Sequence, residues 1–526
     1  MVSITFRNAK NFVLGLVTLG ALWLGLSISG LANEFATDMI SNYVAGKVAP
    51  LEMIVQSETQ SLKAAMAISA KAAGRAARLA VEKNLLEIAQ RREAAMLSLM
   101  EIDPSAARQQ AMSEEWRNQL PAEVRLHVEE PLYVTGTLEV LGRLDDDGRI
   151  GIERYVESGD TRLQIFMAGR PDDFDTGDYV TIDGLRLADR LAADSSGIKR
   201  QSTAHDSLGP RTDENLGVRY ARALVININF NPARSEPWTM ERVDEIFNGQ
   251  ILPWFIEASY NHFSLEADIA GWYTIAASPT TCASSTFRTQ AVDAATADGF
   301  DVSQYDYVII AFPRVTACRW AGLGQISGRY SWLNNAMSRS TATHELGHNL
   351  GLYHSHSLRC SEGPLSGSCT TTEYGDRFDR MGRGAAPFHG DYRAYLTWIP
   401  ASDVISLTPE DGARTVTIRS VESLSGPRVL RVARPGTNQT FSIDMREPIG
   451  FSEPLQSYPA LQNGVAVYIG SSQRNQSIID MAYETPVVDD APLMVGDTFT
   501  DPNSTLSITP LAVGNGEATI TVRYGP

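Results

Sequence analysis

The residues best suited to chemistry lie in one run, residues 344–354, which reads His-Glu-Leu-Gly-His-Asn-Leu-Gly-Leu-Tyr-His. Side chains four residues apart share one face of an α-helix, so His344 and His348 can bind one metal ion. Gly351 can end that helix in a left-handed turn, which brings His354 back as a third ligand. Three histidines leave one position of a tetrahedral zinc ion open, as catalytic zinc requires. The run predicts a catalytic site for one Zn²⁺ ion.

Glu345 follows the first histidine and has a different predicted role. It projects beside the histidine pair, where it can accept a proton from water instead of binding the metal. His356 competes with His354 for the third ligand position, but its spacing from Gly351 is less suited, and we expect it at the surface. Two other interpretations are a helix with solvated histidines and a structural zinc site, which normally prefers thiolates and four protein ligands.

The run 344–354 resembles the elongated zinc motif of the metzincin metallopeptidases, and within them that of the gametolysin family. Residues 373–382 (Glu-Tyr-Gly-Asp-Arg-Phe-Asp-Arg-Met-Gly) are similar to that family's stretch around the Met-turn. This similarity implies that Met381 packs beneath the zinc ligands without binding the metal. Weaker similarities precede the motif, at residues 257–260, 263–265, 271–273, 321–324 and 331–332. The resemblance covers residues 218–400 well, the later part loosely, and residues 33–190 not at all.

The chain departs from the metzincin pattern at two points. Met381 is followed by Gly-Arg, whereas some metzincins have a Tyr there that serves as an extra zinc ligand, so no such Tyr is predicted. No cysteine precedes Cys282. Latency through a cysteine bound to the zinc is therefore excluded.

The resemblance implies a zinc metalloendopeptidase with protein or peptide substrates. Glu345 would take a proton from zinc-activated water and return it to the leaving amine. Gametolysin relatives act on extracellular matrix and cell-wall proteins, which suggests a substrate class. Two alternatives stay open: a zinc hydrolase of another amide or ester bond, and a catalytically silent extracellular binding or adhesion protein that keeps the fold. The intact Glu345 favours the enzymes.

The chain has four cysteines, and all lie around this motif: Cys282, Cys318, Cys360 and Cys369. Cys360 and Cys369 bracket a short Ser/Gly/Pro loop, which favours a local disulfide and would leave Cys282 to pair with Cys318. Four cysteines allow three pairings, and a reduced pair also stays open. Disulfides form and persist in oxidising compartments.

The N-terminus indicates export. Arg7 and Lys10 precede the apolar stretch 12–28, and small residues follow up to Ala32. This order is typical of a signal peptide over residues 1–32, cleaved after Ala32. An uncleaved stretch is long enough to span a bilayer and would anchor the protein. In either case the remainder is secreted, extracellular or periplasmic, and a membrane is a partner only without cleavage.

Length and composition limit the fold and the partners. The chain has 526 residues, of which 43% are hydrophobic, and this composition excludes a mainly disordered or fibrous protein. Lys and Arg number 45 against 62 Asp and Glu, which gives a net charge of −17. Coating nucleic-acid phosphates requires a surplus of basic residues. No nucleic-acid partner is therefore expected.

The chain before the motif divides into helices and then strands. Region 33–130 is predicted to be helical, with one long Ala-rich helix at 51–101 and a second at 105–120. Region 131–193 is predicted to form a small β-barrel, with strands at 132–141, 150–156, 163–167 and 179–187. Together, residues 33–193 lie where a propeptide would, and a permanent accessory domain is the alternative. The polar segment 194–217 is predicted to be a linker, in which Lys199 and Arg200 form a candidate maturation site.

Strands and helices alternate in the catalytic region, residues 218–400, as in a metzincin-like α/β zinc peptidase core. Strands are expected at 222–230, 263–270 and 307–312, and helices at 239–260 and 287–298. Thr341 or Thr343 is expected to cap the helix that carries the motif. Region 401–526 is predicted to be a β-sandwich-like domain, with strands at 416–421, 429–432, 441–445, 465–469 and 518–524. The complete chain is therefore predicted to be a multidomain α+β protein.

Overall fold

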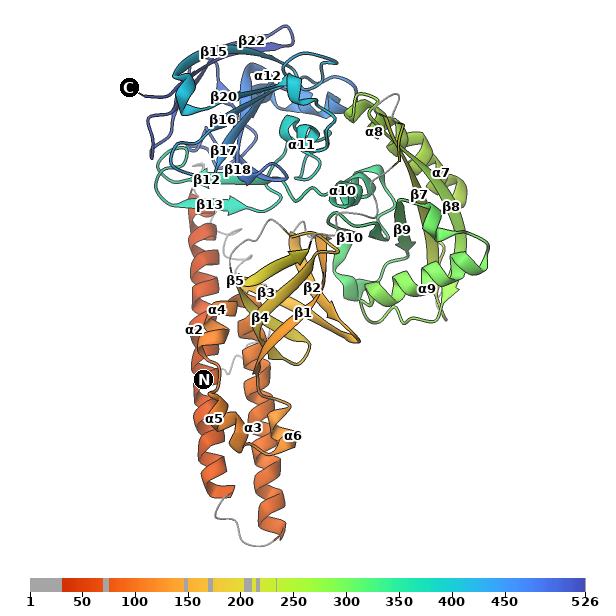
Figure 1. Cartoon of the computed structure of the whole chain (residues 1–526), viewed down its shortest axis with the longest axis vertical. Helices are drawn as coiled ribbons and strands as arrows, with labels where there is room; N and C mark the ends of the chain where they lie inside the picture. Colours follow the sequence, from red (N-terminus) through yellow and green to blue (C-terminus); the bar gives the residue numbers. More distant parts are fainter. Residues whose placement is uncertain are drawn as a thin grey trace, which may run out of the picture.

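A computed structural model describes residues 31–69, 75–145, 150–168, 174–202, 211–213, 218–232 and 234–525 (Figure 1). The predicted signal peptide, 1–32, lies outside these residues except for its last two positions, which begin the first helix. No helix within the described part of the chain is long and apolar enough to cross a membrane. The chain is a multidomain α+β protein with N-terminal helices, a five-stranded barrel and further sheets.

Two long helices, α2 (Leu31–Ser69) and α3 (Arg75–Ile102), project from the rest of the molecule side by side (Figure 1). The single helix predicted over 51–101 is therefore wrong. A single helix with an Ala-rich stripe would bury little apolar area by itself. A hairpin in which the two helices pack against each other buries more and is more stable. The predicted second helix is also divided, into α4 (Pro104–Gln109) and α5 (Glu114–Gln119), and a short α6 (Ala122–Arg125) follows.

A buried ion pair ties the hairpin to the start of the barrel. The side chains of Arg92 and Glu129 are both 0% exposed, and the guanidinium donates two hydrogen bonds to the carboxylate, at 2.5 and 2.9 Å. Arg92 Nε also donates to Thr59 Oγ1 in α2 at 2.7 Å, and the backbone N–H of Met112 donates to Glu129 at 2.7 Å. Two helices and the chain entering the first strand are therefore held at one point.

The barrel consists of β1 (Glu130–Asp145), β2 (Ile150–Ser158), β3 (Thr161–Ala168), β4 (Tyr179–Leu187) and β5 (Arg190–Ser202). It closes in the order β1-β2-β3-β5-β4-β1, with β3 and β5 parallel and the other pairs antiparallel. Its interior is filled by aliphatic side chains, among them Leu138, Val140, Val156, Ile182 and Leu191.

Strand β5 was not predicted, and it extends into the predicted linker 194–217. The polar sequence concealed it because the outward positions are exposed while Leu191, Ala193 and Ile198 face the barrel core. The candidate maturation pair, Lys199 and Arg200, therefore lies in a paired strand instead of an open loop. Arg200 also binds the buried carboxylate of Asp178 at 2.7 Å.

The barrel continues directly into the sheet of the catalytic region. Strand order in that sheet is β1-β10-β11-β9-β7-β6, with β8 on the other side of β7. The strands are β6 (Arg211–Asp213), β7 (Val218–Phe230), β8 (Phe263–Ile275), β9 (Tyr307–Phe312), β10 (Trp320–Gln325) and β11 (Tyr330–Asn334). Strand β7 is parallel to β8 and to β9, and β9 is parallel to β11. Strand β10 is antiparallel to β11.

Helices cover both faces of this sheet. A nearly continuous helix, α7 (Met240–Ile246), η1 (Phe247–Ile251) and α8 (Leu252–Ala258), packs on one face with the motif helix, and α9 (Ser284–Ala297) packs on the other. The predicted order of strands and helices over residues 222–312 is confirmed.

The C-terminal region contains two further sheets that share one core. The larger has the order β13-β12-β19-β18-β17-β16-β14, with β20 beside β18, and the smaller has the order β15-β23-β22-β21. Strands β12 (His356–Cys360) and β13 (Cys369–Thr372) belong to the larger sheet although they follow the zinc motif directly. The sheet therefore crosses the predicted boundary at residues 400–401, because β12 pairs with β19 (Asn475–Ile479).

The remaining C-terminal strands include all five that were predicted. They are β14 (Val404–Leu407), β15 (Ala413–Arg419), β16 (Val429–Ala433), β17 (Thr440–Asp444), β18 (Gly464–Ser472), β20 (Leu493–Met494), β21 (Phe499–Thr500), β22 (Ser507–Gly514) and β23 (Glu517–Arg523). Both expected disulfides are present, Cys282–Cys318 and Cys360–Cys369. Two disulfides indicate an oxidising environment.

The buried ion pair gives a stability prediction. Glu129→Gln leaves the Arg92 guanidinium buried without its counter-charge, which should lower the local free energy of unfolding by about 3–5 kcal/mol. Hydrogen exchange of the α2 and α3 amides in the full chain measures this change. Glu87→Gln is the control, because Glu87 forms an exposed pair with Lys83. Equal protection in both variants would contradict the assigned importance of the buried pair.

Candidate active site

The motif helix, α10 (Arg339–Asn349), begins and ends through residues that suit those positions. Ser338 is the N-cap, and its hydroxyl accepts a hydrogen bond from the backbone N–H of Thr341 at 3.2 Å. The prediction that Thr341 or Thr343 caps this helix is therefore wrong, because the helix starts one turn earlier. Gly351 has a φ of +100°, a conformation that favours glycine, and it turns the chain back after the helix.

Three histidines converge at this turn. One nitrogen each from His344, His348 and His354 lies within 4.8 Å of the others, and the Nε2 atoms of His348 and His354 are 3.0 Å apart. None of the three is more than 1% exposed. The predicted return of the chain to bring His354 beside the helical pair is confirmed.

The outer nitrogen of each ring is held by an oxygen. Nδ1 of His344 donates to the carbonyl of Arg380, and Nδ1 of His348 donates to the carbonyl of Leu352, both at 2.8 Å. Nδ1 of His354 lies 3.2 Å from the carboxylate of Glu373. Because carbonyl and carboxylate oxygens only accept, each ring carries its proton on Nδ1 and directs the Nε2 lone pair inward.

This arrangement fits a metal ion. Burial lowers the pKa of all three histidines, to about 4 for His348, so the rings are neutral and ready to act as ligands. His344 Nε2 is buried and has no hydrogen-bond partner among the residues that the structure describes. Such an atom is costly unless something binds it. A zinc ion would satisfy the inward nitrogens and keep an open position.

Glu345 is placed beside the histidines, and no ion pair to it is formed by the residues that the structure describes. Its side chain is buried, and neither carboxylate oxygen has a hydrogen-bond partner within the described part of the chain. Burial raises its pKa well above the usual value. A Cβ at Gly322 would lie 2.0 Å from Glu345 Oε1, and one at Gly324 would lie 3.1 Å from Oε2. These two glycines of β10 therefore make room for the carboxylate, a role that sequence reasoning missed.

Met381 lies beneath α10, where the resemblance expects it. It is buried, and a Cβ at Gly347 would come within 2.4 Å of its sulfur. Its carbonyl accepts from the backbone N–H of Ser355 at 2.9 Å, and its own N–H donates to the carboxylate of Asp379 at 2.6 Å. The turn at Met381 is thus connected to the residue that follows His354.

Sequence reasoning also missed two neighbours of the histidines. Glu373 holds His354, and the Tyr374 ring stands edge-on to His344 and His354, with ring centroids 5.2 and 5.8 Å away. Both residues lie in the Met-turn-like stretch, but no spacing rule marks them. His356 was predicted at the surface and is 5% exposed. It is buried because β19 covers β12, and its Nε2 bonds Asn475 at 2.9 Å.

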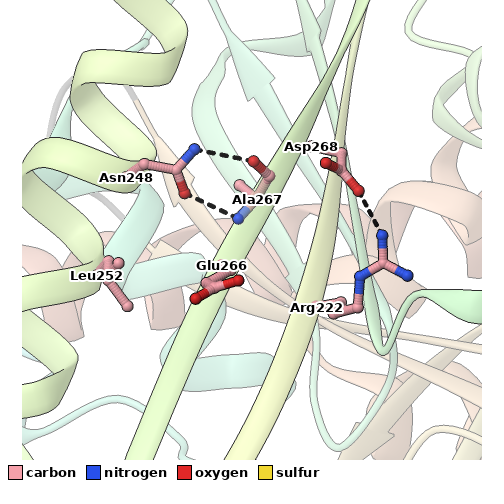
Figure 2. Close-up of a pocket in the computed structure, with 6 residues that line it drawn as sticks. All are labelled: Arg222, Asn248, Leu252, Glu266, Ala267 and Asp268. Carbon is pink, nitrogen blue, oxygen red and sulfur yellow. Dashed lines mark hydrogen bonds and ion pairs between the residues drawn. The ribbon is translucent and has the colours of Figure 1, made fainter.

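A surface pocket of about 330 Å³ lies elsewhere, on β7, β8 and the helix above them (Figure 2). Its lining residues are Arg222, Asn248, Leu252, Glu266, Ala267 and Asp268. Figure 2 shows Arg222 paired with Asp268, at 2.6 Å, and the Asn248 amide bonded on both sides to the backbone of Ala267. These polar groups satisfy one another, and none of the six residues is a partner of the histidines.

Residues 222–439 match the protein family described as Gametolysin peptidase M11. No curated protein matches the chain. One solved structure, titled "Structure of a chaperone-substrate complex", aligns with 16% identity and a TM-score of 0.24 over 47% of this chain and 38% of that chain. This chain thus spans less than half of that structure, and so low a score supports no conclusion about fold.

The family match includes the helix, the three histidines, the buried glutamate and the methionine turn. Residues 222–439 therefore contain a gametolysin peptidase M11 domain, a metallopeptidase domain whose buried His344, His348 and His354 have the spacing of the metzincin motif.

Proposed function

We propose that this protein is an exported endopeptidase that uses one zinc ion, with Glu345 as the general base. The observation that supports this proposal is that three inward imidazole nitrogens lie beside the buried carboxylate of Glu345, which has no hydrogen-bond partner among the described residues. Structural zinc sites have no use for such a carboxylate, because all four positions are filled by ligands. The disulfides support a location outside the cytoplasm.

The histidines of the site would bind the zinc, and Glu345 would transfer protons. His344, His348 and His354 would hold the zinc, which supplies Lewis-acid chemistry by acidifying water and polarising the substrate carbonyl. Glu345 accepts the proton of the attacking water on its carboxylate and delivers it to the leaving amine.

The site favours an enzyme over a silent binding protein, and the family match favours peptide bonds over other amide or ester bonds. A silent binding protein gains nothing from a buried acidic side chain that lacks a partner, since such a group costs stability. Another amide or ester bond would use the same proton transfer, so the substrate class rests on the family match. Proteins or peptides are the proposed substrates, and proteins of the extracellular matrix or cell wall are the class suggested by the resemblance.

Replacing the proposed base separates catalysis from metal binding. Glu345→Gln keeps the size of the side chain but removes its basicity, so hydrolysis of a denatured protein should fall by about 10²–10⁴-fold while zinc content is unchanged. Activity is assayed before and after limited proteolysis followed by mild urea, so that a latent form is included. Glu362→Gln, at an exposed position, is the control. Full activity of Glu345→Gln would refute the proposed role.

The identity of the third ligand can be tested by zinc analysis. His354→Gln should lose the bound zinc, whereas His356→Gln should keep it, because His356 bonds Asn475 and lies outside the triad. Thermal unfolding of both variants shows whether either one misfolds. Zinc loss in the His356 variant alone would reverse the assignment.

The contact between Glu373 and His354 gives a finer prediction. A carboxylate on the outer nitrogen of a ligand histidine fixes its orientation and raises its basicity, and removing such a partner typically lowers metal affinity about 10–100-fold. Glu373→Gln should therefore weaken zinc binding by that amount in a competition titration with a chelator. An unchanged affinity would show that Glu373 does not orient His354.

A further inference from the structure

The first strand of the barrel lies along the edge of the catalytic sheet, beside the proposed zinc site. Strand β1 pairs with β10 in antiparallel register, from Leu141 opposite Gln325 to Asp145 opposite Trp320. Residues 141–144 also pair with β2 on their other side. The end of β1 therefore belongs to both the barrel and the catalytic sheet, and it covers the edge of β10 there.

Gly142 brings this strand into contact with the imidazole of His348. A Cβ built on Gly142 would lie 2.2 Å from His348 Nε2 and 2.4 and 2.5 Å from the two adjacent ring carbons. Only a residue without a side chain fits this position. The β1 backbone thus packs against the face of the ring next to Nε2, and His348 is 0% exposed.

A reacting peptide carbonyl must come within about 3–3.5 Å of the attacking group, next to these histidines. The backbone of β1 already lies along the edge of β10 and against the ring face of His348. A protein substrate that reached the site in extended form would meet β1 at the edge of β10, since strand addition needs a free edge. Substrate and β1 therefore compete for one position.

Several side chains hold the barrel against the catalytic region. The carboxylate of Glu139 accepts from Gln325 Nε2 at 2.7 Å and from Arg288 Nη1 at 3.2 Å. Asp175 accepts from Ser327 Oγ at 2.8 Å and from Arg474 Nη1 at 2.6 Å. Arg474 comes from the C-terminal region, so the barrel is bound by both parts of the chain that follow it.

Apolar contacts cross the same boundary. Leu141 of β1 packs in a core cluster of the catalytic region, and Ile326 and Tyr353 of the catalytic region pack in the barrel core. Tyr353 directly precedes the ligand His354, and its hydroxyl donates to the carbonyl of Phe174 at 2.7 Å. The barrel therefore contacts the motif through its backbone and its side chains.

We propose that the barrel, residues 130–202, is an inhibitory module that keeps the peptidase latent through strand β1, with Gly142 over His348. The proposal rests on the proposed function, whose site it regulates. Because the contact consists of strand pairing, ion pairs and shared cores, cutting the chain after β5 does not release the barrel. Activation requires that the barrel also leave the edge of β10.

A side chain at position 142 tests the contact directly. Gly142→Ala cannot be accommodated without moving β1, and overpacking of this kind should raise the activity of the full chain about tenfold or more. Gly151→Ala is the matched control, because Gly151 pairs with Arg143 in the adjacent strand and its added Cβ would approach nothing closer than 3.6 Å. Its activity should equal that of the unaltered chain.

A cut after the barrel tests the same contact without altering it. A recognition sequence for a site-specific protease replaces residues 204–209 of the full chain, and the cut protein is examined by size exclusion. The two pieces should co-elute with activity still low, and activity should rise about tenfold or more once mild urea separates them, as for a contact weakened by 1.4 kcal/mol. Full activity of the uncut chain would overturn the proposal.

A readout that does not depend on peptidase activity separates the two proposals. In metal-free protein, reaction of His348 with diethylpyrocarbonate, located by mass spectrometry, should be slow in the uncut chain and at least about tenfold faster after separation. Equal reactivity in both forms would overturn the inhibitory contact. Faster reaction in a protein that hydrolyses no peptide would support the contact and refute the proposed function instead.

Discussion

The constraint on which the site depends is that three buried imidazoles must be neutral and turn their free nitrogens to one point. Each ring meets it in the same way, because its Nδ1–H donates a hydrogen bond to an oxygen outside the site. Two of these oxygens are backbone carbonyls, of Arg380 and Leu352, so the ring orientation follows from the path of the chain. The fold positions the ligands largely through its main chain, which few single side-chain changes can alter.

This constraint explains why distant parts of the chain meet at α10. Strand β10 can approach Glu345 only because glycines face the carboxylate. On the other side of α10, the turn at Met381 includes Arg380, whose carbonyl accepts from His344. The carboxylate of Asp379 holds this turn by accepting from the backbone N–H groups of Met381 and His389. The C-terminal sheet then covers the chain after His354 through β12 and β19. The C-terminal region is thus part of the support for the site.

Local features could be predicted from the sequence, and contacts between distant segments could not. The four-residue spacing of His344 and His348, with Gly351 after them, was sufficient to predict that His354 joins the pair. All three histidines lie on one helix and the turn that directly follows it. The pairing of β1 with β10 joins residues about 180 positions apart, and β10 was not predicted as a strand. The burial of His356 was missed for the same reason, because the strand that covers it lies near residue 475.

The most direct test of the central claim is X-ray absorption spectroscopy at the zinc edge of the zinc-loaded full chain. Three imidazole nitrogens at about 2.0–2.1 Å and one further oxygen donor are expected, as at a catalytic zinc with an open position. Sulfur scattering at about 2.3 Å, or four protein ligands that close the site, would contradict the account.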